Sequence, residues 1–470
     1  MSQMNVFNPL PRAPLYLTTF FIALLLLACP AARAMTPDRA VQLSRDYLAA
    51  ASPVERSSVL RQLAAYDGPI DPVIQRLAAR AYLPVKPGII AQAHFASEAL
   101  RKKHPDDLLN FLVPPSYRLD NATGLIVFEH GGGAHTPRRV AVAALLPSRP
   151  RGPDSASGEL FAATGMITVG PSSPDKPDYR RWCLEESDEY IADVIAECKE
   201  RFHIDPDRVF LIGHSMGGFG AYQAALRYPD RFAAIVAHSG SWRFGYWPAL
   251  RGTPLGIVNG SHDARPGIRD HSTDVEYGRL TDQILTRDHL EHTFFEHNGA
   301  HAFSGGRKYA FDYLHSMKDR RRDPYYDHIG LASPNGFRDK YVYPVTDNRW
   351  LTLDTMTPGN INYDELIPHN QNSFTIWRLE HRVAPHPGAS LDAVNRHDNT
   401  IEVATRNVAR FTVWLHPRMV DVSRPVTVVV DGKVRFSGRL AASLATALES
   451  YERRQDWGMI YPVKVVVDIP

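Results

Sequence analysis

The sequence predicts an α/β fold, in which a mostly parallel sheet is flanked by helices, followed by a β-rich C-terminal domain. Residues 125–128 and 209–212 are short apolar runs that read as strands, and the second run precedes a stretch with helical spacing of apolar residues. A glycine-rich turn at residues 213–217 joins one of these strands directly to a helix. After about residue 325 the pattern changes to period two, which is typical of strands.

The turn Gly213-His214-Ser215-Met216-Gly217 is a G-x-S-x-G element. Val209 to Ile212 read as a buried strand before it, and Phe219, Tyr222 and Leu226 fall at helical spacing after it. Such a turn strains the serine backbone and tolerates only small neighbours, so it projects the hydroxyl above the sheet. Ser215 is therefore the candidate nucleophile, and the N–H of Met216 is a candidate oxyanion donor at a helix start.

A second glycine-rich segment, His130-Gly131-Gly132-Gly133, follows the apolar strand 125–128. Glycines at this position let backbone amides approach a substrate carbonyl, which makes Gly132 or Gly133 the candidate second oxyanion donor. The simpler alternative is a flexible glycine turn. The order and the spacing of the two segments favour the oxyanion interpretation.

A serine nucleophile needs a histidine base that is held by a carboxylate. Asp263 follows a predicted strand at 254–259, and His301 follows a predicted strand at 292–296, which gives the chain order Ser, Asp, His. His297 is the rival base, and Gly299 and Ala300 before His301 favour the latter because a small-residue loop can curl back over Ser215. Asp270 and Asp274 compete with Asp263, but helix capping explains an aspartate at the start of the predicted helix 274–287.

These residues resemble those of the α/β-hydrolase superfamily, especially secreted bacterial esterases and prolyl-oligopeptidase-like hydrolases. The stretch from Ile204-Asp205-Pro206-Asp207-Arg208 to Tyr228-Pro229-Asp230-Arg231-Phe232 is similar to feruloyl-esterase, polyhydroxyalkanoate-depolymerase and dienelactone-hydrolase-like proteins. The resemblance covers about residues 108–320. It implies an eight-stranded sheet and a triad of Ser215, Asp263 and His301, but no substrate, because one scaffold serves several chemistries.

The sequence divides into four predicted parts: a signal peptide at 1–34, a helical N-terminal segment at 35–105, a catalytic domain at 106–322 and a β-rich, sandwich-like domain at 323–470. The apolar run 15–28 is too short to span a membrane, and Ala32-Arg33-Ala34 offers a cleavage site, so we expect a secreted or periplasmic protein. A lipid anchor at Cys29 is the alternative. The N-terminal helices either form a lid or docking surface or simply pack against the catalytic domain.

In the C-terminal part, four segments read as strands, at 400–405, 410–415, 426–430 and 463–469, and one helix is expected near 441–453. Asp431-Gly432 predicts a two-residue hairpin turn. Pro358-Gly359-Asn360 and Pro385-His386-Pro387-Gly388 read as loops. The domain is either a structural appendage or binds polysaccharide, for which it would need exposed tryptophans; the candidates are Trp350, Trp377, Trp414 and Trp457.

Composition limits the partners. The chain has 53 basic and 51 acidic residues, so its net charge of +2 indicates neither nucleic acid nor an anionic surface as a partner. The run 318–323 reads as a solvated helix end. Cys183 and Cys198 are expected to be unpaired, because the helix between them separates them beyond disulfide reach. The histidine spacing supports no metal site, and we expect no cofactor.

The sequence therefore predicts a serine hydrolase that cleaves carboxylic esters, with a small or polymeric, possibly polysaccharide-linked, substrate. Alternatives are a prolyl-oligopeptidase-like peptidase and a non-catalytic protein that binds a glycan or surface. The absence of propeller repeats ahead of the catalytic domain disfavours the peptidase. Trp242 and Tyr246, in the loop 239–250, could line a substrate pocket or simply pack.

Overall fold

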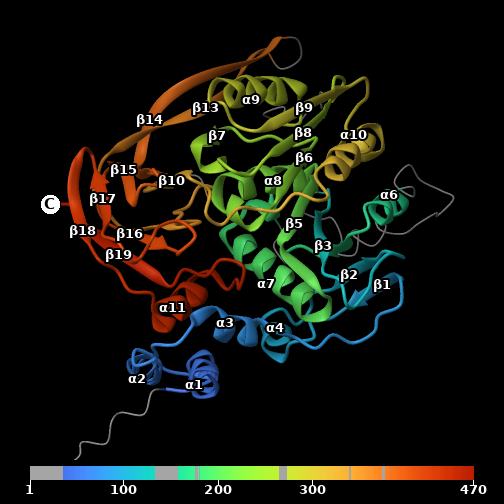
Figure 1. The fold of residues 1–470 in the computed structure, drawn as a ribbon. Coiled ribbons are helices and arrows are strands. Elements are labelled where there is room, and N and C mark those ends of the chain that lie inside the picture. Colours follow the sequence, from blue (N-terminus) through green and yellow to red (C-terminus); the bar gives the residue numbers. More distant parts are fainter. Residues whose placement is uncertain are drawn as a thin grey trace, which may run out of the picture.

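The computed structural model describes residues 35–132, 157–174, 178, 180–263, 272–337, 340–372 and 376–470. Its centre is an eight-stranded sheet, with the strand order β1-β2-β4-β3-β5-β6-β8-β9 (Figure 1). β1 and β2 are antiparallel to their neighbours, and the strands from β4 to β9 are parallel. The strands are β1 (Gly88–Ala93), β2 (Leu109–Val113), β3 (Thr123–Glu129), β4 (Ile167–Pro171), β5 (Ile204–His214), β6 (Ala234–His238), β8 (Leu255–Gly260) and β9 (His292–His297). The predicted fold class is confirmed.

Helices cover both faces of this sheet because its strands are apolar on both sides. On β5, Val209 and Leu211 face a core that α7, α8 and α9 complete, whereas Phe210 and Ile212 face a core that α6 and α10 complete. The helices are α6 (Ser157–Ala163), α7 (Glu185–Arg201), α8 (Met216–Arg227), α9 (Val275–Arg287) and α10 (Phe303–Ser316), with short 3-10 helices η1 (Arg181–Cys183), η2 (Pro229–Arg231) and η3 (Trp247–Leu250). Cys183 and Cys198 are buried and free, as predicted.

The C-terminal part consists of two sheets that enclose a separate apolar core. One sheet has the order β18-β17-β15-β14-β13-β7 with β10 also paired to β14, and the other has the order β11-β12-β16-β19. Apart from β7 (Phe244–Gly245), which comes from the catalytic domain, its elements are β10 (His328–Pro334), β11 (Asp347–Asn348), β12 (Leu351–Met356), β13 (Asn360–Asn372), β14 (Ile376–Asn395), β15 (Thr400–Arg406), β16 (Val408–Leu415), β17 (Val426–Val430), β18 (Lys433–Gly438), α11 (Leu444–Arg454) and β19 (Val463–Asp468). The predicted strands and the Asp431-Gly432 turn are present; Asp431 and Gly432 both have positive φ, as this turn requires.

Residues 385–388 were predicted to be a loop, and this prediction is wrong. They lie inside the long strand β14, where Pro385 and Pro387 are paired with Asn362 and Asn360 of β13. The other two strands that pair with β14, β10 and β15, extend only to Gly388 and Ser390, so neither strand pairs with the prolines, although the carbonyl of Pro387 accepts the N–H of Asn335. A proline is tolerated there because its missing N–H would have no acceptor.

The N-terminal segment also differs from its expected form. It holds the helices α1 (Pro37–Ala49), α2 (Pro53–Leu63), α3 (Ile70–Ala78) and α4 (Glu98–Lys103), but also strand β1, which extends the catalytic sheet. Its main apolar cluster includes Leu444 and Leu448 of α11, so α1 to α3 pack on the C-terminal domain rather than on the catalytic sheet (Figure 1).

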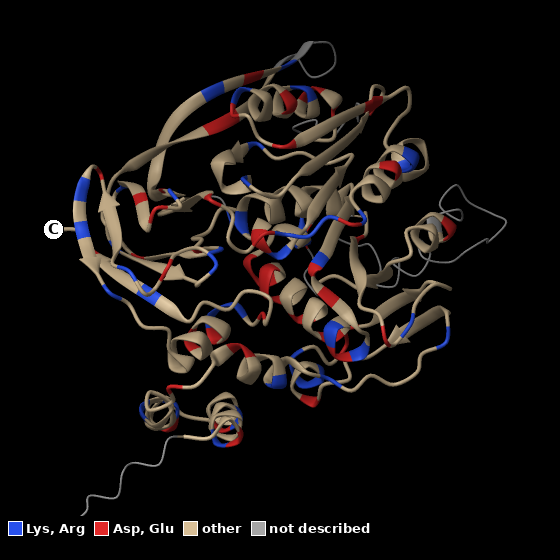
Figure 2. Cartoon of the chain, viewed as in Figure 1, with Lys and Arg blue, Asp and Glu red and all other residues tan. Residues whose placement is uncertain are grey.

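Basic and acidic residues are interspersed over the view in Figure 2, in line with the small net charge. The run 318–323 is not simply a solvated helix end, because Arg322 is buried and ion-paired with Asp207 and Asp456. Of the tryptophans proposed for carbohydrate binding, Trp350 and Trp414 are buried, Trp457 stacks on Tyr451, and the Trp377 side chain lies outside the described part. Among the described residues, no helix is long and apolar enough to cross a membrane.

Candidate active site

Ser215 lies in a sharp turn between the end of β5 and the start of α8. Its φ of 56° and ψ of −111° are strained for a residue with a side chain. The neighbouring glycines make the turn possible: a Cβ at Gly213 would lie 1.9 Å from the carbonyl oxygen of Gly217, and a Cβ at Gly217 would lie 1.9 Å from that of Glu129. The chain must therefore cross itself closely here, and the serine is held at the carboxyl edge of the sheet.

Ser215, His301 and Asp263 form a continuous hydrogen-bonded chain. Ser215 Oγ lies 2.7 Å from His301 Nε2, and His301 Nδ1 lies 2.9 Å from both carboxylate oxygens of Asp263. Asp263 is 1% exposed, whereas Ser215 and His301 are each 9% exposed. The Asp263 carboxylate thus accepts a hydrogen bond from His301 Nδ1, and His301 Nε2 is within hydrogen-bonding distance of the Ser215 hydroxyl.

The loops that carry these side chains are joined by backbone contacts. The N–H of His262 donates to the carbonyl of Gly299 over 2.9 Å, which ties the loop after β8 to the loop after β9. His214 Nε2 lies 2.9 Å from the carbonyl oxygen of His301, which ties the same loop to the serine turn. These contacts fix the position of the imidazole relative to the hydroxyl.

The rival residues occupy other places. His297 ends β9, stacks on Tyr309 and faces His238; burial lowers its pKa, and its Nε2 has no hydrogen-bond partner in the structure. Asp274 caps α9 by accepting the N–H of Glu276, as the capping interpretation predicts. Asp270 lies outside the described residues.

The glycine-rich segment after β3 passes beside the serine. A Cβ at Gly131 would lie 3.2 Å from Ser215 Cβ, and Gly132 has a φ of 147°, which favours glycine. The carbonyl of His130 accepts the Trp182 indole N–H over 3.1 Å, which anchors the segment. Met216 is the first residue of α8, so its N–H has no partner within the helix. Gly133 lies outside the described residues.

Glu129, the last residue of β3, is a buried acid that sequence reasoning missed. It is fully buried beneath the serine turn, and neither carboxyl oxygen has a hydrogen-bond partner in the structure. Burial, with a smaller effect of Asp188, raises its pKa well above the usual value of a glutamate. The sequence did hold a signal for it, since Glu129 directly follows the apolar run 125–128.

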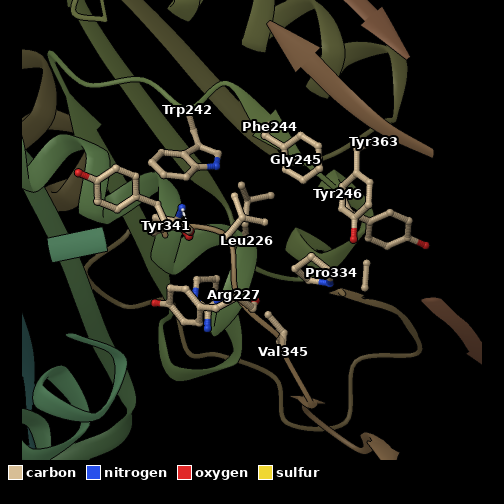
Figure 3. A pocket seen from close by; sticks show the side chains of 14 residues that line it. Leu226, Arg227, Trp242, Phe244, Gly245, Tyr246, Pro334, Tyr341, Val345 and Tyr363 are labelled. Atoms are coloured by element: carbon tan, nitrogen blue, oxygen red, sulfur yellow. Dashed lines mark hydrogen bonds between the residues drawn. The ribbon is translucent and has the colours of Figure 1, made fainter. Parts of the chain in front are cut away.

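Trp242 and Tyr246 line a cavity of about 40 Å³ between α8 and the C-terminal domain (Figure 3). Trp242 is buried and Tyr246 is half-buried, and burial raises the pKa of Tyr246 to about 12. Trp242 and Phe244 also line an adjacent, larger cavity. Among the described residues, no group of three or more His, Cys, Asp or Glu side chains could hold a metal ion.

Known proteins match parts of the chain. It is 35% identical over 75 residues to the bifunctional acetylxylan esterase/xylanase XynS20E of Neocallimastix patriciarum, which covers 16% of the chain and 11% of that protein. It is 32% identical over 89 residues to dipeptidyl-peptidase 5 of Porphyromonas gingivalis, which covers 17% of the chain and 13% of that protein. The matches thus span about a tenth of these relatives' length.

Among solved structures, the feruloyl esterase module from Clostridium thermocellum aligns with 52% of the chain and 96% of its own, at 14% identity and a TM-score of 0.37. The family described as alpha/beta hydrolase fold matches residues 124–377, which is more than half of the sequence. These residues hold β3 to β9, the serine turn and the loops that carry Asp263 and His301. The chain belongs to the alpha/beta hydrolase fold family.

Proposed function

We propose that this protein is an exported serine hydrolase that cleaves carboxylic esters, with Ser215 as nucleophile, His301 as base and Asp263 as the acid that orients the base. The observation that carries the proposal is the hydrogen-bonded chain from Asp263 through His301 to Ser215. Such a chain requires a strained serine backbone and an almost completely buried carboxylate, and both are unfavourable for stability. We therefore expect it where it serves catalysis.

In the proposed reaction, Ser215 Oγ attacks the ester carbonyl carbon while His301 Nε2 takes the hydroxyl proton. The negative charge on the carbonyl oxygen is stabilised by the N–H of Met216 and by Gly132 or Gly133. His301 then donates its proton to the departing alcohol, which leaves an acyl group on Ser215. Water, deprotonated by His301, attacks this acyl-enzyme and releases the acid and the free serine.

Among the matched relatives, one is named a dipeptidyl-peptidase, whereas three are named an acetylxylan esterase/xylanase, a cutinase and an iron(III) enterobactin esterase, which supports ester substrates. We therefore expect small esters or esters linked to a polysaccharide. Export follows from the predicted signal peptide at 1–34, which, like the alternative lipid anchor at Cys29, lies outside the described residues.

Hydrolysis of p-nitrophenyl acetate and butyrate, compared with that of prolyl-peptide anilides, tests the proposal. Wild-type protein should hydrolyse the esters faster than the anilides, and Ser215→Ala should lower ester turnover by several orders of magnitude. Circular dichroism should show an unchanged fold. Cleavage of the anilides without ester turnover would favour the peptidase instead, and full ester turnover by Ser215→Ala would reject Ser215 as the nucleophile.

A further inference from the structure

A cavity of about 190 Å³ lies between the catalytic domain and strand β13 of the C-terminal domain. The catalytic domain supplies Arg180, Trp242 and Phe244, and β13 supplies Leu366 and Ile367. Phe337, from the segment after β10, completes an aromatic wall, with its ring centroid 4.6 Å from that of Phe244. Two parts of the chain that are about 120 residues apart in the sequence thus build one cavity.

Two of the residues that line this cavity, Arg180 and Trp242, lie on the side of the catalytic sheet that carries Ser215. The guanidinium carbon of Arg180 lies 4.8 Å from the centre of the Phe219 ring, and the N–H of Phe219 donates to the carbonyl of Ser215. On the opposite side, Trp242 follows four residues after His238, whose carbonyl accepts the N–H of Ser215. Arg180 follows the end of β4 and Trp242 follows the end of β6. Both strands run parallel to β5, so these two residues lie at the same edge of the sheet as Ser215.

The wall from β13 is firmly attached to the catalytic domain. β13 pairs with β7 through Asp364 and Glu365, and the N–H of Leu366 donates to the carbonyl of Arg243 over 2.8 Å. Arg287 of α9 binds both carboxylate oxygens of Asp364, at 2.9 and 3.0 Å. The position of Leu366 and Ile367 is therefore set by the catalytic domain itself.

The cavity favours an apolar group. Its aromatic rings and the Leu366 and Ile367 side chains present apolar surface, and Arg180 stacks over the rings of Phe219 and Trp242. Two other charged residues line the cavity and are already engaged: the carboxylate of Glu365 pairs with Arg382 and His386, and Nε of Arg243 donates to the carbonyl of Leu366. A volume of about 190 Å³ holds a ring or a short branched chain, which is smaller than a drug-sized ligand site.

We propose that this cavity is the subsite for an apolar group of the ester substrate, and that the C-terminal domain determines its size through Ile367. The inference rests on the proposed ester hydrolysis at Ser215. The apolar group belongs either to the acyl or to the alcohol part of the ester. Ile367 is the residue to change because it is half-buried, whereas Leu366 is part of the catalytic core.

Two ester series test the proposal. The first keeps p-nitrophenol and compares acetyl with cyclohexanecarbonyl and benzoyl groups; the second keeps the acetyl group and compares methyl with cyclohexylmethyl and benzyl alcohols. In one series, Ile367→Trp should lower the kcat/KM ratio of ring to small ester by about ten-fold or more, because one misfitting group in an apolar pocket has effects of this size. Ile367→Ala enlarges the cavity and should raise the same kcat/KM ratio of ring to small ester in that series.

Val383→Trp is the matched control, because Val383 lies on the neighbouring strand β14, is 53% exposed and does not line the cavity. It should leave both ratios as in the wild type. Unchanged ratios in both series for folded Ile367→Trp and Ile367→Ala would overturn the subsite, even when the wild type hydrolyses acetate esters. A wild type without any ester hydrolysis would instead overturn the proposed function and the subsite with it.

Discussion

Asp456→Asn should destabilise the protein strongly, because Asp456 holds two cations of the catalytic domain against the C-terminal domain. Its Oδ2 lies 2.8 Å from Arg322 Nη1 and 3.3 Å from Lys199 Nζ, and its Oδ1 accepts the N–H of Gly458 over 2.8 Å. Burial alone would raise the pKa of Asp456, but Arg322 and Lys199 hold it well below the usual range. The carboxylate is therefore ionised in the folded protein.

The magnitude follows from what the substitution leaves behind. Asparagine keeps the volume and can still accept from Gly458, so no cavity forms. Arg322, however, is 3% exposed and, among the residues that the structure describes, keeps Asp207 alone as an ionic partner, at 3.1 Å. Lys199 can lose its proton more easily than an exposed lysine, because burial already lowers its pKa. Breaking a buried pair costs about 3 to 5 kcal/mol. Because a deprotonated Lys199 leaves no second unpaired charge, we expect the lower end, about 3 kcal/mol.

Urea unfolding of Asp456→Asn, followed by circular dichroism at pH 7, measures this loss. The matched control is Asp468→Asn, which removes an exposed carboxylate that pairs with Arg410 and should leave the unfolding midpoint unchanged. A free energy of unfolding that falls by less than about 1 kcal/mol in Asp456→Asn would refute the argument, because such a loss is typical of a surface pair.

Three further substitutions test the site. His301→Ala should lower ester turnover by several orders of magnitude while His297→Ala, which removes a histidine not bonded to Ser215, should change it little; equal losses would contradict the assignment of the base. Asp263→Asn should likewise slow turnover far more than Asp274→Asn, in which the asparagine can still cap α9, and the reverse order in an initial-rate assay would reject Asp263. Glu129→Gln should change the pH dependence of stability: the folded state keeps the Glu129 proton above the pH at which the unfolded chain loses it, so wild-type stability falls as pH rises beyond about 4.5, by at most about 1.4 kcal/mol per pH unit. The variant lacks this loss and should gain stability over the wild type between pH 5 and 7 in thermal melts, and a gain that is independent of pH would show that Glu129 is ionised in the fold.

Local signals in the sequence predicted four strands of the catalytic sheet, β3, β5, β8 and β9, whereas the full eight-stranded sheet was implied by the family resemblance. β3 and β5 contain short apolar runs, and the glycines at 213 and 217 are required by backbone contacts of the turn itself. The Asp431-Gly432 turn is equally local, because its two positive φ angles depend on the residue types. For the same reason, the sequence could single out Ser215, Asp263 and His301, each of which follows a strand end.

Features that depend on distant partners were not predictable. Pro385 and Pro387 read as loop residues, and they fit inside β14 because the pairing of β14 with β10 and β15 ends before them, at Gly388 and Ser390. Arg322 reads as a solvated charge until Asp456, 134 positions further along, is brought beside it. The pairing of β13 with β7 depends on tertiary packing, so the wall formed by Leu366 and Ile367 gave no signal in the sequence.

The central claim is that Ser215 is activated by His301 and Asp263, and covalent labelling tests it most directly. The intact protein should react with a fluorophosphonate, and mass spectrometry of its peptides should place a single adduct on Ser215. Labelling should disappear in Ser215→Ala and be slowed by orders of magnitude in His301→Ala, with both variants folded. An adduct on another residue, or unchanged labelling in folded His301→Ala, would contradict the account.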